Sequence, residues 1–147
     1  MPGDKRYTAY CGLYCADCIP SKGELFSTVN ELERLLEQLH VGQYAAIKSE
    51  TNAVFKGFDT FMEMLRAIKG LESSAPCREG CKPDCRIVRC AVGKGYEGCW
   101  QCNQNMECDK LERLKRIHPC LRDHLQLLAG EDLDNWSGKR GRHYTWL

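Results

Sequence analysis

Eleven cysteines occupy two regions of this 147-residue chain. Three of them, Cys11, Cys15 and Cys18, lie within eight residues, and the other eight fall between positions 77 and 120. Thiolates at short spacings bind soft metal ions such as zinc, or the iron of iron–sulfur clusters. In an oxidising compartment the same thiols form disulfides. The cysteines therefore predict either metal binding or disulfide formation.

The expected compartment decides between these two chemistries. Residues 1–20 contain Asp4, Lys5 and Arg6 but no apolar block typical of a signal peptide, and no run of 18 apolar residues predicts a membrane span. We therefore expect a soluble, cytoplasmic protein without a membrane partner. In a reducing cytosol, an odd count of eleven thiols fits metal ligands better than a fully paired disulfide framework.

The cysteine spacings are those of metal-binding knuckles. Short spacers let the backbone turn around one ion, and Gly12 offers an unusual backbone angle inside the first cluster. Ten cysteines permit two complete four-ligand sites with two thiols to spare, and the spacing leaves their pairing open. The predicted metal ligands are Cys11, Cys15, Cys18, Cys77, Cys81, Cys85, Cys90, Cys99, Cys102 and Cys108.

The remaining candidate ligands are weaker. Cys120 lies beside Leu121 in an apolar pattern, which favours a buried free thiol. His118 precedes it by two residues and is held as a reserve ligand. The other histidines have no cysteine near them in sequence.

Two alternative chemistries share parts of these spacings. The C-x3-C-x2-C order of residues 11–18 also occurs in radical enzymes that use S-adenosylmethionine, but those enzymes are larger and alternate strands with helices. The pair Cys99 and Cys102 has the spacing of a thioredoxin-like redox pair, which requires a strand before it and a helix after it. The sequence shows neither context.

The elements that position the cysteines are helices. Apolar residues recur at three and four residues over 22–40, and again from a cap at Asn52 to a left-handed stop at Gly70. Ser21 and Glu24 have the spacing of a capping box. A third stripe over 111–128 is split by Pro119, and residues 86–92 predict one short helix. The expected fold is mainly α, a small helical domain with metal-binding cysteine knuckles and loops.

The predicted organisation is one domain followed by a tail. Residues 1–130 form a single cysteine-rich domain with a helical middle over 22–70 and a cysteine-rich part over 77–120. Two antiparallel helices in the middle return the chain to its start, so that the first cysteines meet the later ones. Residues 131–147 form a C-terminal tail that packs on its own domain or on a protein partner.

Charge and motifs exclude several functions. The net charge of +1 gives no general attraction to nucleic acid, and although the tail combines basic and aromatic residues, Glu131, Asp132 and Asp134 precede them. The chain contains no nucleophile elbow, phosphate-binding glycine loop or HExxH pair. The sequence therefore offers no catalytic constellation, which favours a protein that is not an enzyme without deciding the question.

The ordered set of cysteine motifs resembles a known family. The segments YCGLYCADC, CRIVRCAVGKGYEGCWQC and MECDKL are similar to those of the cysteine-rich prokaryotic family catalogued as domain of unknown function 3795. The resemblance spans residues 10–111 and implies a small metal-binding protein without an established reaction. This chain departs from the family in the spacing of Cys77 and Cys81, which is longer by one residue, and in Met106 and Glu107, where the family has an aromatic residue and a proline.

Three functions follow as hypotheses. The first is a binding or adaptor module whose cysteines hold structural zinc, because structural zinc needs saturated thiolate coordination. The alternative is an iron–sulfur redox or electron-transfer protein, to which the same ligand set is suited. Thiol-based redox chemistry or metal storage is the third, and it requires labile or exposed sulfurs.

Overall fold

The computed structural model describes residues 4–147, and residues 1–3 of the predicted domain lie outside this part. The described chain is mainly helical, which confirms the expected fold class. Its single β-type pairing is an isolated bridge between Thr8 and Tyr14. The α-helices of residues 4–147 are α1 (Asp4–Tyr7), α2 (Gly23–Gln38), α3 (Val41–Lys48), α4 (Phe58–Lys69), α5 (Arg86–Gly93), α6 (Asp109–Ile117) and α7 (Leu121–Gly130).

Short 3-10 segments connect these helices, and several of them carry the cysteines. None of the helices in the described part is long and apolar enough to cross a membrane. The 3-10 segments are η1 (Cys15–Asp17), η2 (Ile19–Ser21), η3 (Ala53–Gly57), η4 (Cys77–Glu79), η5 (Cys99–Gln101), η6 (Asn105–Glu107) and η7 (Ser137–Lys139).

The chain divides into two compact units. We call residues 22–72 the helical unit, and residues 4–21 together with 73–147 the cysteine-rich unit. The helical unit is thus inserted between two segments of the cysteine-rich unit, and residues 131–147 belong to the latter.

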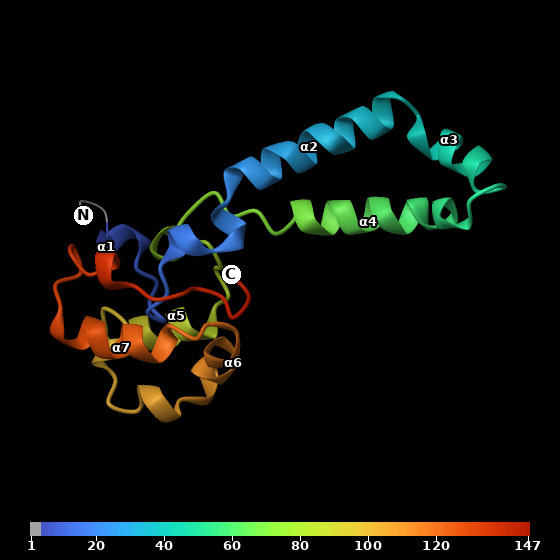
Figure 1. The fold of residues 1–147 in the computed structure, drawn as a ribbon. Coiled ribbons are helices and arrows are strands. Elements are labelled where there is room, and N and C mark those ends of the chain that lie inside the picture. The colour runs from blue at the N-terminus through green and yellow to red at the C-terminus, as the bar shows by residue number, and fades with distance from the viewer. Residues whose placement is uncertain (1–3) are drawn as a thin grey trace. The chain divides into compact units, whose positions relative to one another are not determined.

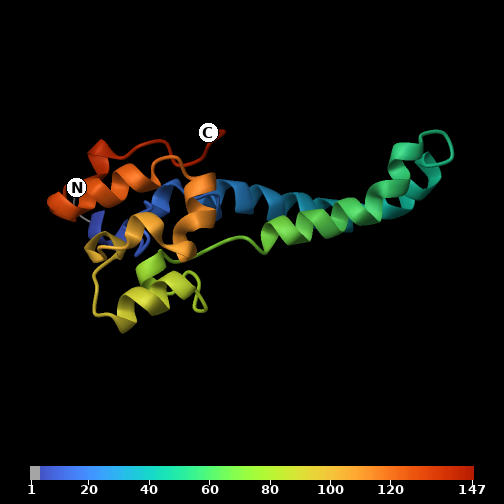
Figure 2. The same ribbon diagram turned by 90° about the horizontal axis from the view of Figure 1, so that it is seen from below.

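The helical unit is a hairpin of α2 and α4, with α3 at its turn (Figures 1 and 2). Val29, Met62 and Leu65 are buried between the two long helices. Glu33 on α2 forms ion pairs with Arg66 and Lys69 on α4. The two long helices confirm the predicted helical middle, while α3, an eight-residue helix, was not expected. It begins after His40, whose φ of 51° lies in the left-handed region.

Two of the predicted end signals are wrong. Ser21 and Glu24 do not form a capping box, because the Ser21 hydroxyl donates to the carbonyl of Cys18 (2.7 Å) and Lys22 occupies the N-cap of α2. Gly70 has a φ of −67° and ends α4 with right-handed backbone. Asn52 does cap, but its side chain accepts from the Val54 amide at the start of η3, ahead of α4.

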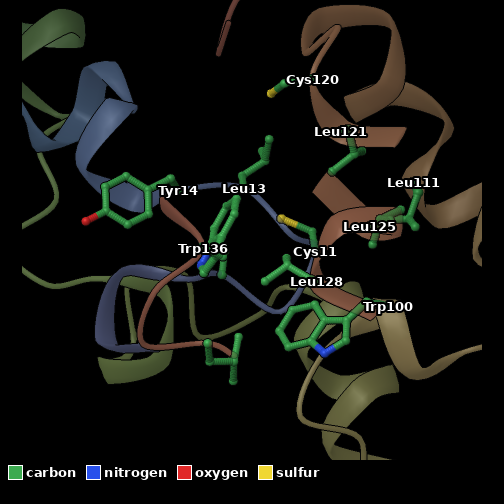
Figure 3. Close-up of a cluster of buried hydrophobic side chains, with 12 residues drawn as sticks. Cys11, Leu13, Tyr14, Trp100, Leu111, Cys120, Leu121, Leu125, Leu128 and Trp136 are labelled. Atoms are coloured by element: carbon green, nitrogen blue, oxygen red, sulfur yellow. The ribbon is translucent and has the colours of Figure 1, made fainter. Parts of the chain in front are cut away.

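The cysteine-rich unit has its own apolar core (Figure 3). Pro119 separates α6 from α7, as predicted, and Leu121, Leu125 and Leu128 on α7 pack into this core. Trp136 is completely buried in it. The tail segment therefore contributes a large side chain to the centre of the unit.

Buried hydrogen bonds join the two chain segments of this unit. The Trp136 indole N–H donates to the Thr8 hydroxyl (2.7 Å), and the Ser137 amide donates to the Asp4 carboxylate (3.1 Å). Burial opposes ionisation of Asp4, but several favourable interactions, those with Ser137 the largest of them, together lower the pKa of this carboxyl. The beginning and the end of the described chain are thus held together in one core.

His124 on α7 makes a third connection of this kind. Its Nδ1 lies 2.9 Å from the Gly12 carbonyl, and its Nε2 accepts from the Gly141 amide at 2.9 Å. Since a carbonyl only accepts and an amide only donates, the imidazole is neutral and carries its proton on Nδ1. Gly12 has a φ of +92°, the unusual backbone angle expected at this position.

Acid should therefore destabilise the protein through His124. Burial lowers the pKa of His124 below its ordinary 6.5. Below about pH 6.5 the imidazole binds a proton in the unfolded chain but not in the folded protein. The contribution of neutral His124 to the free energy of unfolding is therefore complete above that pH and is lost as the pH falls through the lowered pKa. When the pH is lowered from about 7.5 to about 5.5, we expect the free energy of unfolding to fall less in His124→Gln than in the wild type.

Urea unfolding at the two pH values measures this difference. Burial also lowers the pKa of His118, so a residual pH dependence is expected in the variant. The charged groups that act on the His124 ring, Asp123, Asp17 and Arg140, are present in both proteins. Equal pH dependence in the two proteins would show that His124 carries no such linkage.

Candidate metal centre

All ten predicted metal ligands lie in the cysteine-rich unit, and all eleven cysteines are free thiols. They come from four local structures: the turn around η1, the turn around η4, helix α5, and the loop between α5 and α6 that contains η5 and η6. The core brings these structures into one unit, and within it the thiols form two neighbourhoods.

The first neighbourhood, which we call the first thiol group, consists of Cys15, Cys18, Cys77 and Cys81. Cys15, Cys18 and Cys81 line a cavity of about 280 Å³. The backbone amide of Cys77 donates to the Cys15 sulfur at 3.3 Å. Such amide-to-sulfur bonds satisfy sulfur atoms in many metal knuckles and stabilise their charged form.

The second neighbourhood, the second thiol group, consists of Cys90, Cys99, Cys102 and Cys108. All four line a cavity of about 400 Å³. Cys90 lies on α5, Cys99 begins η5, and Cys108 is the N-cap of α6. Helix α5, the start of α6 and the loop that contains η5 thus supply four sulfurs to one cavity.

Three cysteines fall outside these two groups. Cys11 is buried in the apolar core, and burial raises its pKa well above the ordinary value, with Cys77, Cys99 and Cys15 adding to the rise. Cys85 is the N-cap of α5. Cys120 is 3% exposed in the core, the environment expected for a buried free thiol.

Neither group is a closed coordination sphere. Within residues 4–147, no three Cys, His, Asp or Glu side chains converge closely enough to hold one ion as they stand. Rotation of the thiols about χ1 moves each sulfur between staggered positions without moving the backbone. The structure thus supplies neighbouring donors, and closure around an ion requires such rotations.

Burial keeps several of the candidate thiols protonated at physiological pH. Burial raises the pKa of Cys15 and of Cys99 to about 12, and that of Cys18 to about 11. A redox-active or nucleophilic cysteine needs a lowered pKa, because the thiolate is the reacting species. Cys99 also begins a 3-10 segment with no strand before it in the described chain. The pair Cys99 and Cys102 therefore lacks the features of a thioredoxin-like pair.

Arg78 holds three of the cysteine-bearing segments together. Its guanidinium donates to the carbonyls of Thr8 and Glu97, each at 2.7 Å, and lies 4.5 Å from the centre of the Tyr10 ring. Residues 8–10 precede Cys11, and Glu97 precedes Cys99. A single side chain thus sets the spacing between these segments.

The C-terminal segment reaches the first thiol group, which the sequence did not predict. His143 Nε2 lies 3.3 Å from the Cys18 sulfur. The reserve ligand His118 instead directs Nδ1 toward the His143 carbonyl (2.6 Å). Since 125 residues separate Cys18 from His143, no local pattern linked them.

Removing the Arg78 guanidinium should destabilise the unit. We expect Arg78→Met to lower the free energy of unfolding by about 1.5–3 kcal/mol, because two charge-assisted hydrogen bonds to backbone carbonyls are lost. Urea unfolding followed by circular dichroism gives this value.

A matched control is Arg6→Met. Arg6 forms a two-point ion pair with Glu79 on the surface, and exposed pairs contribute little because water screens them. The control should leave the urea midpoint nearly unchanged. Equal losses in the two variants would mean that Arg78 acts only as a surface charge.

Comparison with known proteins places the chain in a family. No curated protein and no solved structure matches it. Residues 7–113 match a family model described as a protein of unknown function (DUF3795), which confirms the resemblance of the cysteine motifs. The matched region contains all ten predicted ligands and ends in α6, so that His118, Cys120 and the C-terminal segment lie beyond it. Since the match covers more than half of the sequence, the chain belongs to the DUF3795 family of proteins of unknown function.

Proposed function

We propose that this chain is a metal-binding protein whose two thiol groups each hold a structural zinc ion, and that it serves as a binding or adaptor module. The observation that carries the proposal is the gathering of cysteines from four local structures around two cavities. Structural zinc takes four ligands; the second group lines its cavity with four sulfurs, and the first lines its cavity with three. Cys11 and Cys85, of the predicted set, lie outside both groups.

The clustering of several sulfurs suits a cation as the bound partner. Each group places several sulfurs near one another, and mutual repulsion adds to burial in raising their pKa values. A divalent ion would displace the protons and stabilise the thiolates together. Because the ligands come from separate segments, binding would also stabilise the fold.

An iron–sulfur redox protein is the alternative function. Thiols line the second cavity, and thiols are the ligands of iron–sulfur clusters. In the first group an amide donates a hydrogen bond to a sulfur, and such bonds tune the reduction potential of a cluster. Sulfur donors alone do not distinguish the two cofactors. Measuring the metal and acid-labile sulfide content of the protein distinguishes zinc from an iron–sulfur cluster.

The helical unit supports the adaptor role. Leu25 and Leu32 on α2 and Leu39, its C-cap, follow a seven-residue spacing, and 40–68% of each is exposed. Phe61 and Met64 on α4 are also exposed. Exposed apolar rows of this kind mark protein interaction sites. A protein partner that covers them is part of the proposed function.

Zinc content tests the proposal directly. Protein purified without oxygen should contain about two zinc ions per chain, no acid-labile sulfide and no visible colour. Cys102→Ser should lose one of the two ions, while Cys120→Ala should retain both, because Cys120 lies in the apolar core. Iron with matching sulfide and absorbance in the visible range would replace zinc by the alternative cofactor. Protein without any metal would refute both.

Metal binding should release protons and strengthen as the pH rises. Thiols with pKa values of about 11 to 12 are protonated at neutral pH, so each must lose its proton to become a ligand. We expect about three to four protons released per zinc ion, measured by titration calorimetry of the metal-free protein in buffers of different ionisation enthalpy. Release of fewer than about one proton per ion would contradict thiolate ligation.

A further inference from the structure

We infer that His143 is the fourth ligand of the first metal site, which then consists of Cys15, Cys18, Cys81 and the His143 imidazole. This inference rests on the proposed metal-binding function. The site would contain the three cysteines that line the smaller cavity and one nitrogen donor from the C-terminal segment.

The contact distance is that of two ligands on one ion. His143 Nε2 lies 3.3 Å from the Cys18 sulfur. For zinc–sulfur and zinc–nitrogen bonds of about 2.3 and 2.0 Å, two ligands at the tetrahedral angle lie about 3.5 Å apart. The pair is thus already near the spacing that a shared ion requires.

The C-terminal segment is fixed on the loop that carries Cys18. Arg140 donates to both oxygens of Asp17 (2.6 and 3.3 Å), directly before Cys18. The Ile19 amide, directly after it, donates to the Tyr144 hydroxyl at 2.9 Å. Three successive residues of the loop therefore contact the segment that contains His143. Ligands held by such neighbouring contacts bind with little loss of freedom.

The His143 ring is also held from its sides. The ring is 7% exposed and lies edge-on to His118 and Tyr144, with centres 4.6 and 4.5 Å apart. The other described histidines have different roles. His118 directs Nδ1 to a carbonyl, His124 uses both nitrogens on backbone groups, and His40 is the N-cap of α3 in the helical unit.

Cys77 is the competitor for the fourth position. Its backbone amide donates to the Cys15 sulfur, which is the role of a group that supports a ligand. With His143 as the ligand, Cys77 supports the site through its amide and need not bind the ion.

Cadmium-113 NMR of the whole chain identifies the ligands without any substitution. The metal-free protein is loaded with ¹¹³Cd²⁺ in the absence of oxygen. One resonance should couple to the ring protons of His143 and to the β protons of Cys15, Cys18 and Cys81. Coupling to Cys77 and to no imidazole would overturn the inference and leave the metal-binding proposal intact. Failure to bind cadmium would overturn both.

Matched variants give an independent readout. We expect His143→Gln to weaken cadmium binding at the first site by more than about 100-fold, measured by competition with a chelator, while the second site is unchanged. His40→Asn, which changes a histidine of the helical unit and keeps a residue that tolerates left-handed backbone, should keep both affinities. His143→Cys should retain two ions, because cysteine replaces the lost donor. Equal affinities in His143→Gln and the wild type, or loss of the first ion in His143→Cys, would overturn the inference.

Discussion

The fold depends on holding two distant chain segments in one core. Residues 4–21 and 73–147 are separated in sequence by the whole helical unit, yet Trp136 is fully buried among side chains from both segments. Its indole N–H is satisfied by Thr8, and His124 bridges Gly12 and Gly141. Closing so long a loop reduces chain entropy, and these buried contacts offset that loss.

The placement of the cysteines follows from the same constraint. The first thiol group takes Cys15 and Cys18 from the early segment and Cys81 from the later one, so it exists only when the two segments are joined. The second group lies entirely within the later segment, between α5 and α6. An ion in the first group would therefore stabilise the closure of the unit, whereas an ion in the second would order a local loop. The two proposed sites differ in this way although their donors are similar.

The sequence predicted the elements better than their connections. Strong apolar periodicity located α2, α4, α6 and α7, and Pro119 located the break between the last two. The capping residue predicted for the start of α2 was wrong because its side chain has another partner. The Ser21 hydroxyl donates to the Cys18 carbonyl instead of capping α2. The short helix α3 lacks the charged face that marks the others, and it was missed. The cysteine motifs located the candidate ligands, but no spacing rule showed which of them share a cavity.

The interactions that shape the first thiol group also explain why its histidine was missed. The family match ends at residue 113, but the loop around Cys18 is fixed by Arg140, His143 and Tyr144. In the sequence these residues form part of a basic and aromatic tail. Composition shows which residues the tail contains but does not predict which residues they contact in the fold. Burial of Trp136 positions this segment, and hydrogen bonds to Asp17 and Ile19 then fix its register on the loop. A residue beyond the family match can therefore contact a sulfur that lies within it, since the core and not the motif determines which groups meet.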